Sequence, residues 1–191
     1  MNKLLETIKI DNGKACHLSY HQQRCDYSLK QCGKNTVYNL QSIIKPPQNK
    51  IFRCRIIYDD TAVDVSYHAY SQTPVSSLKL IVSDIEYPLK FADRYELDKL
   101  YKQKGAADDV LIVKNNFLTD TTRANIALFD GDKWFTPKSP LLFGTTRQRL
   151  LKEGKIFPRN IHVNDLHKFT KIAVMNALAG FHVVKNGIMM H

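Results

Sequence analysis

Six polar residues gather within residues 115–134, between apolar residues that are typical of strands. They are Thr119, Asp120, Thr121, Thr122, Arg123 and Asn125. A carboxylate can hold a proton on a basic group, while amides and hydroxyls can orient that group through hydrogen bonds. A solvated turn would explain the same residues, because most polar side chains lie on protein surfaces. The stretch therefore has two interpretations until the rest of the chain is considered.

Three further segments combine charged or hydroxyl residues with structural signals. "HQQR" places Arg24 in a predicted helix, and "PLKFADRYEL" places Lys90 between a predicted strand and a predicted helix. "TPKSPLLFGTTRQRLL" places Gly144 before a helix start, with Thr145 and Thr146 as candidate caps. Taken singly, each segment is typical of a surface residue or a plain helix cap.

The elements that must position these residues follow from hydrophobic periodicity and turn residues. Ser19 is the expected N-cap of the first helix and Gly33 its stop. Up to residue 70 the pattern predicts a small α+β unit: strand 4–10, helix 19–33, a shorter helix over 37–45 and a hairpin over 50–70. Residues 71–77 are the predicted linker, so we expect two subdomains, 1–72 and 73–191. The larger one is predicted to contain strands 78–85, 109–114, 124–129 and 133–136, helices near 92–103, 145–153 and 164–174, and a closing hairpin piece over 180–187.

Composition argues against several classes of protein. The 191-residue chain has no run of 18 apolar residues and no signal-peptide core, so we expect neither a membrane helix nor secretion. The four cysteines lack C-x-x-C spacing and form no zinc pattern with the seven histidines, which predicts reduced thiols in a cytoplasmic protein without a metal. The net charge of +10 favours an anionic partner. Basic residues are spread along the chain without a nucleic-acid motif, which favours a small anionic substrate over nucleic acid or a membrane.

In order and spacing, four segments resemble the class IV aminotransferase family, whose members bind pyridoxal 5′-phosphate. "LETIK" and the later "H-x-x-R" resemble the family's opening strand and phosphate-binding arginine, and "K-x-x-D-R" at 90–94 resembles its cofactor-lysine segment. "LTDTTRANI" resembles the "VTE…NL" strand pair, and "TP…LLFGTTR" resembles the phosphate loop. The resemblance covers nearly the whole chain. It implies a two-subdomain fold-type IV enzyme of mixed α+β and α/β class, similar to D-amino-acid aminotransferase, with a truncated N-terminus and a homodimeric assembly.

The resemblance implies a role for each matched residue. Lys90 would bind the cofactor aldehyde and then move protons at the substrate carbon, which requires a pKa below the ordinary lysine value. Arg24 would contact the cofactor phosphate through its guanidinium. Gly144, Thr145 and Thr146 would add backbone N–H groups at a helix start, where phosphate is favoured.

Five other residues complete the implied site. Asp120 stands where the family usually has glutamate, and it would hold the proton on the pyridine nitrogen, with Asn125 in the same wall. Tyr95 matches a tyrosine that donates a hydrogen bond to the phenolic oxygen of the cofactor, although a half-buried helix tyrosine is an equal alternative. Arg123 and Lys9 are candidate contacts to the substrate.

Two positions bear on the reaction. Thr7 in "LETIK" matches a threonine of the 4-amino-4-deoxychorismate lyases, whereas branched-chain transaminases have glycine there. Its hydroxyl favours elimination of pyruvate from 4-amino-4-deoxychorismate to leave 4-aminobenzoate. Near the end, Leu178 replaces a phosphate-binding threonine. Either one hydrogen bond to the phosphate is lost, or Asn176 or a backbone N–H group replaces it. A class IV amino-acid transaminase, an inactive member of the family and a cofactor-free basic binding module stay open as alternatives.

Overall fold

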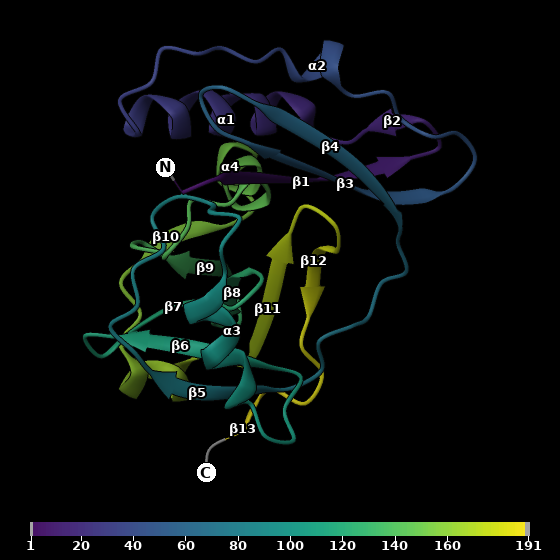
Figure 1. Cartoon of the computed structure of the whole chain (residues 1–191). Helices are drawn as coiled ribbons and strands as arrows, with labels where there is room; N and C mark the ends of the chain where they lie inside the picture. Colours follow the sequence, from purple (N-terminus) through teal and green to yellow (C-terminus); the bar gives the residue numbers. More distant parts are fainter. Residues whose placement is uncertain (1, 190–191) are drawn as a thin grey trace. The chain divides into compact units, whose positions relative to one another are not determined.

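The computed structural model describes residues 2–189, and the chain divides into two compact units (Figure 1). The first unit comprises Met1–Gln72 and Leu89–Asp93, and the second comprises Thr73–Pro88 and Arg94–His191. The division after residue 72 coincides with the boundary expected from the sequence. The short segment 89–93 differs, because it belongs to the first unit although it follows the linker. Across residues 2–189, no helix has the length and apolar character needed to span a membrane.

The first unit is a four-stranded antiparallel sheet of order β2-β1-β3-β4. Its elements are β1 (Leu4–Asp11), β2 (Lys14–Ala15), α1 (Leu18–Gln31), α2 (Leu40–Ile43), β3 (Ile51–Tyr58) and β4 (Val63–Ala69). Burial alternates along β1 and β3, because successive side chains of a strand point to opposite faces. One face packs against α1 (Figure 1), and the core there includes Leu4, Ile8, Leu29, Cys54 and Ile56.

Backbone conformation, rather than a capping side chain, sets both ends of α1. His17 is the N-cap, with φ of 53° and no capping hydrogen bond from its side chain, so the predicted Ser19 cap is wrong. At the other end Gly33 has φ of 72°, and its N–H donates to Lys30 O at 2.9 Å. The N–H of Lys34 donates to Leu29 O at 2.9 Å, which completes a Schellman motif. The predicted stop at Gly33 is therefore confirmed.

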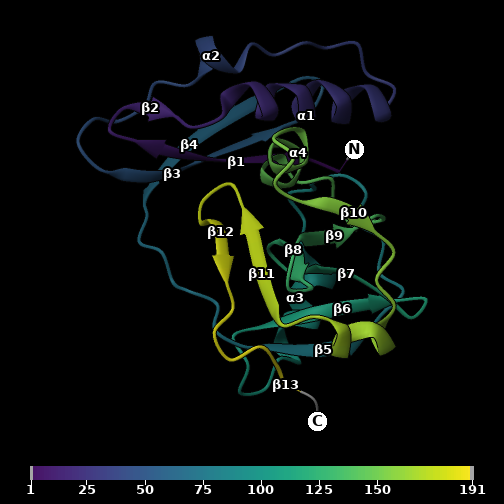
Figure 2. The same ribbon diagram turned by 180° about the vertical axis from the view of Figure 1, so that it is seen from behind.

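The second unit is built on a larger mixed sheet of order β10-β9-β8-β7-β6-β5-β13. The hairpin of β11 and β12 joins this sheet through β8, and Figure 2 shows its two strands side by side. The strands are β5 (Leu78–Val82), β6 (Asp109–Lys114), β7 (Phe117–Thr121), β8 (Asn125–Phe129), β9 (Trp134–Pro137), β10 (Phe157–Arg159), β11 (Lys171–Asn176), β12 (Gly180–Val183) and β13 (Ile188–Met189). The helices are α3 (Tyr95–Lys102), α4 (Thr145–Lys152) and the 3-10 helix η1 (Val163–Lys168).

A tight turn joins β6 to β7 and determines where the polar stretch begins. Asn115 and Asn116 have φ of 50° and 65°, the left-handed conformation that two-residue hairpin turns require. β6 is buried over five of its six residues, and β7 runs antiparallel to it. The turn therefore returns the chain directly into the sheet, so that the polar residues after Phe117 lie in its interior.

Two predicted helices differ from the structure. Residues 164–174 divide into the 3-10 helix η1 and the buried strand β11, because a short apolar run such as "IAVM" fits a buried strand as well as a buried helix. The helix expected over 37–45 is only the four-residue α2. Asn39 caps it by accepting a hydrogen bond from Ser42 N, and Ile44 is already extended, two residues before Pro46.

Candidate active site

The polar residues of the opening stretch are almost all buried. Thr119, Asp120, Thr121, Thr122 and Asn125 have relative exposures of 3–6%. A solvated turn would leave these side chains in water, so this interpretation is wrong. Because buried polar groups need hydrogen-bond partners, each of the five must be accounted for by contacts inside the protein.

The three hydroxyls hold the backbone of the stretch in place. Thr119 Oγ1 donates to Ile112 O at 2.9 Å, across the β6–β7 pair. Thr122 Oγ1 donates to Asp109 Oδ1 at 2.6 Å, and Thr121 Oγ1 accepts from Ala124 N at 3.0 Å. These hydroxyls are therefore structural, and they fix the turn between β7 and β8.

Asp120 and Asn125 face each other across the β7–β8 pair. The Asn125 amide donates to Asp120 Oδ1 at 2.8 Å and to Leu142 O at 2.8 Å. Leu142 N donates to Asp120 Oδ2 at 2.9 Å, so each carboxylate oxygen has one fixed donor. Burial raises the pKa of Asp120 to about 7, although these donors and the charge of Arg147 oppose the rise. The result is a rigid buried carboxyl group that ionises near neutral pH.

Gly144 is the N-cap of α4, and its φ of −70° is available to any residue. A Cβ atom at this position would overlap Asn125 Oδ1, so the absence of a side chain is required by the close approach of that amide. Thr145 and Thr146 are buried in the first turn of α4 rather than acting as caps. The Asn125 amide therefore contacts both Asp120 and the start of α4.

Arg147 is a buried cation whose importance the sequence interpretation missed. Its side chain is 4% exposed, and it donates to Thr136 Oγ1 at 3.2 Å and to Pro137 O at 2.9 Å. Burial lowers its pKa, and the negative charge of Asp120 acts in the opposite direction. The motif "GTTRQR" contained this residue, but nothing in the pattern distinguished it from Arg149, which is only partly buried beside Glu153.

In the first unit, Arg24 forms part of a buried ionic cluster with Glu6 and His21. Arg24 Nε and Nη2 donate to the two carboxylate oxygens of Glu6 at 2.7 and 2.6 Å, and His21 Nδ1 lies 2.6 Å from Glu6 Oε2. Burial alone raises the pKa of Glu6, but the charge and hydrogen bonds of Arg24 and His21 outweigh it and lower the pKa to about 2. Glu6 was also missed, although an acidic residue on the apolar side of "LLETIKI" was a usable signal.

The segment that carries Lys90 is attached to the beginning of β1. Leu5 N donates to Lys90 O at 2.8 Å, and Ala92 N donates to Lys3 O at 2.8 Å. Phe91 forms an isolated antiparallel bridge with Leu4. The half-buried Lys90 is therefore fixed beside the strand that also carries Glu6 and Thr7.

Three other predicted residues lie in different surroundings. Tyr95 opens α3 with 63% of its surface exposed, and Lys99 Nζ lies 4.4 Å from its ring centroid. The side chain of Tyr95 is therefore more exposed than the half-buried helix tyrosine considered above. Arg123 is exposed and stacks on the Tyr101 ring, with its Cζ 4.2 Å from the centroid. Lys9 lies 3.3 Å from Asp11 Oδ2.

Asn176 already has partners near the position where Leu178 replaces threonine. Its Oδ1 accepts from Leu178 N at 3.0 Å and from Ala179 N at 2.8 Å, and its Nδ2 donates to Arg123 O at 3.4 Å. This side chain closes the β11–β12 turn, where its Oδ1 is engaged by the backbone N–H groups of Leu178 and Ala179.

The sequence matches a protein family and a related bacterial protein. The sequence profile of the family described as amino-transferase class IV matches residues 3–186. A protein of Haemophilus influenzae (strain Rd) that is described only as uncharacterised is 40% identical over 187 residues, which cover 94% of this chain and 100% of that protein.

Two solved structures are also similar. One, from Haemophilus somnus 129PT, is a crystal structure of a protein proposed to be a 4-amino-4-deoxychorismate lyase. It is 34% identical, with a TM-score of 0.89, and the match covers 94% of this chain and 98% of that chain. The other is the PLP-bound form of a hypothetical aminotransferase from Mycobacterium tuberculosis. It shares the fold at 17% identity and a TM-score of 0.78, over 97% of this chain and 81% of that chain.

Proposed function

The chain belongs to the class IV aminotransferase family, and we propose that it is a lyase that converts 4-amino-4-deoxychorismate to 4-aminobenzoate, a folate precursor, and pyruvate. Members of this family are enzymes that depend on pyridoxal 5′-phosphate, which is therefore the cofactor of this protein. The family membership sets aside a cofactor-free binding module. The observation that carries the choice of a lyase is the 34% identity to the Haemophilus somnus protein over nearly the full length of both chains.

The second unit has groups that fit the two ends of the cofactor. Asp120 offers a buried carboxyl group, and a protonated pyridine nitrogen beside it would lower its pKa from about 7 and keep it ionised. The first turn of α4 offers the backbone N–H groups of Thr145 and Thr146, which are suited to a phosphate. No acidic side chain lies in that turn, so none competes for these donors.

The first unit supplies the proposed phosphate arginine and the proposed lysine. Glu6 fixes the Arg24 guanidinium in one orientation through two hydrogen bonds, which reduces the entropy lost when Arg24 contacts a phosphate. Lys90 is fixed through its backbone to β1 and is the residue to which the cofactor aldehyde would be attached.

The chemistry divides among few residues. Bound pyridoxal phosphate draws electrons away from the substrate carbon that carries the amino group. Lys90 would move a proton at that carbon, and Asp120 would hold the proton on the pyridine nitrogen. Thr7, half-buried on β1, would assist proton transfer toward the departing pyruvate. Together these three tasks account for an elimination.

A class IV amino-acid transaminase is the second candidate, because Lys90 and Asp120 would serve it equally well. The two reactions differ in their need for an amino acceptor. A lyase turns over repeatedly without a 2-oxo acid, whereas a transaminase stops after one turnover unless one is added. Sustained turnover of 4-amino-4-deoxychorismate in the absence of 2-oxo acids supports the lyase, and strict dependence on them contradicts it.

Thr7 provides a second test. Replacing it with valine keeps the β-branched shape but removes the hydroxyl, so we expect kcat to fall by about 10²-fold while cofactor affinity is unchanged. Thr7→Ser retains the hydroxyl and should preserve most of the activity. Equal rates for the valine and serine variants would exclude a role for the hydroxyl.

A further inference from the structure

The face of the first-unit sheet that lies opposite α1 carries an unusual group of basic residues. Lys9 of β1 is directly opposite Arg53 of β3, and Thr7 is directly opposite Arg55. Residues opposite each other on neighbouring strands project to the same side of a sheet. The rows continue onto β4, and we call the central part of this side the basic face: Thr7, Lys9, Arg53, Arg55, Ser66 and His68. Asp11 of β1 and Asp64 of β4 project to the same side, beyond the ends of these rows.

Cations outnumber carboxylates on this side of the sheet, with Lys9, Arg53 and Arg55 against Asp11 and Asp64. Like charges directly opposite each other destabilise a sheet, and Lys9 and Arg53 are such a pair. Lys9 is compensated by Asp11, at 3.3 Å. In the part of the chain that the structure describes, neither Arg53 nor Arg55 forms an ion pair with a carboxylate. An anionic ligand would relieve this repulsion.

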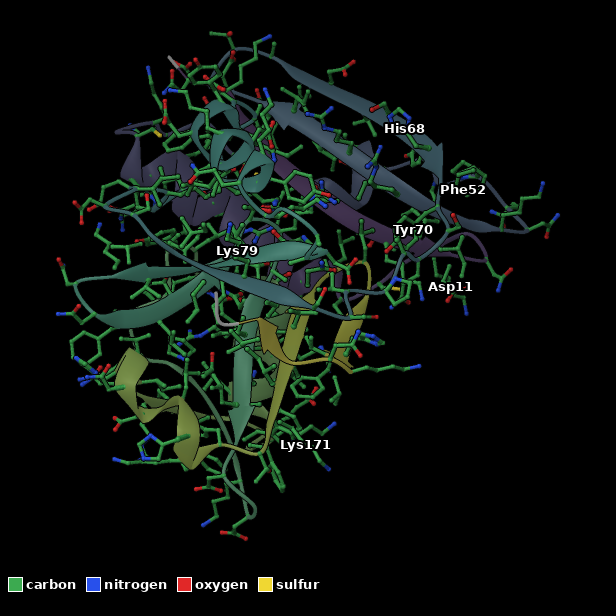
Figure 3. The ribbon with its side chains drawn as sticks, turned by 90° about the horizontal axis from the view of Figure 1, so that it is seen from below. Asp11, Phe52, His68, Tyr70, Lys79 and Lys171 are labelled. Atoms are coloured by element: carbon green, nitrogen blue, oxygen red, sulfur yellow. The ribbon has the colours of Figure 1, made fainter. Side chains whose placement is uncertain are left out.

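A phenol adds to the donors of this face. Tyr70 follows β4, and its N–H donates to Ile51 O at 3.0 Å, which holds it at the end of the sheet. Burial raises the pKa of Tyr70, while the positive charges of Lys9 and Arg53 act in the opposite direction, so both cations are within electrostatic range of its hydroxyl. Figure 3 shows Tyr70 and His68 on this part of the sheet.

The spacing of the two arginines suits a dianion. Arg53 and Arg55 are two residues apart on one strand, so their Cα atoms are separated by about 7 Å. Each guanidinium can bind a carboxylate through two parallel hydrogen bonds. We propose that the basic face binds the two carboxylates of the substrate, with Arg53 and Arg55 as the principal contacts. This inference rests on the proposed function, because 4-amino-4-deoxychorismate is a dicarboxylate.

The test uses an unreactive dicarboxylate of similar carboxylate spacing, 3-(carboxymethoxy)benzoate, and isothermal titration calorimetry on the cofactor-loaded full chain. Arg53→Gln and Arg55→Gln should each raise its Kd by about 10- to 100-fold, the effect expected when a charge-assisted hydrogen bond is lost. Lys30→Gln is the matched control, because it removes one exposed charge from α1, on the other side of the sheet. It should change Kd by less than about 2-fold. The monoanion 3-methoxybenzoate should bind far more weakly to all variants.

The outcomes separate this inference from the proposed lyase activity. Equal Kd values for the Arg53, Arg55 and Lys30 variants would overturn the basic face as the binding site, because net charge alone would then explain binding. If the protein releases pyruvate and the three substitutions change KM equally, the basic face is also overturned as the binding site. The lyase assignment would then remain intact. Arginine-dependent binding of the dicarboxylate without pyruvate release would support the face and contradict the lyase.

Discussion

Asp120 is expected to make the cofactor-free protein less stable as the pH rises, and replacing it with asparagine should remove this effect. Its pKa is about 7 in the folded protein against an ordinary value of 3.8. Below pH 3.8 the group is protonated in both the folded and unfolded states. Between these two values the unfolded state loses the proton first, so the free energy of unfolding falls as the pH rises.

The size of the effect follows from the same pKa difference. At about 1.36 kcal/mol for each pH unit, the shift from 3.8 to about 7 corresponds to about 4 kcal/mol in total. The part lost between pH 5 and pH 7 is about 2 kcal/mol. The amide introduced by Asp120→Asn resembles the protonated carboxyl group at every pH, so this variant should not show the loss. At pH 8 the variant should therefore be the more stable cofactor-free protein, although its catalytic step should be slowed by about 10²-fold or more.

The assay is urea unfolding of the cofactor-free wild type and the Asp120→Asn variant, followed by circular dichroism at several pH values from 5 to 8. The difference between the two proteins isolates Asp120, because the rest of the sequence is the same in both. Asp130→Asn is the control, since it changes an exposed turn carboxylate of the same unit. Parallel stability curves for wild type and Asp120→Asn would refute the reasoning, because the carboxyl group would then have an ordinary pKa.

Four further predictions concern other residues and the assembly. Glu6→Gln should lower the free energy of unfolding by about 3 kcal/mol at pH 7, because Glu6 stabilises the fold above pH 4.5 and loses this effect as the pH falls toward 2. In urea unfolding, the difference in stability between wild type and variant should be smaller at pH 3 than at pH 7. Gly144→Ala should cost about 1–3 kcal/mol through overlap with Asn125, and an unchanged thermal midpoint would contradict this. Lys90→Ala should remain folded but lose activity and the yellow absorbance of the lysine-bound cofactor; borohydride labelling of another lysine in the wild type would disprove the assignment. Light scattering should show a homodimer, because two small cores gain from burial against a second copy, and an active 22.0 kDa monomer would contradict it.

Local pattern predicted the elements whose signals are unambiguous. The alternation in β1 and in the β3–β4 hairpin gave the correct strands, because one face of that sheet is buried and the other is not. Gly33 marked a real helix end, because only glycine adopts left-handed φ without cost. β11 was mistaken for a helix, since a strand buried on both faces has no alternation to reveal it.

The sequence predicted several residues of the candidate site but not which of them contact each other. Asp120 and Asn125 were expected in the same wall of the site, but their direct hydrogen bond depends on the register of β7 and β8, which no local pattern encodes. Glu6 and Arg147 were missed because their importance comes from burial and from partners distant in sequence. Tyr95 matched a pattern, yet its 63% exposure depends on how α3 packs in the second unit.

The most direct test of the central claim is the product balance from 4-amino-4-deoxychorismate with the purified, cofactor-loaded protein. The proposed lyase should release 4-aminobenzoate and pyruvate in equal amounts over many turnovers, with no 2-oxo acid added. The Lys90→Ala variant should release neither product. Consumption of the substrate without pyruvate, or amino transfer to an added 2-oxo acid in place of elimination, would contradict the account.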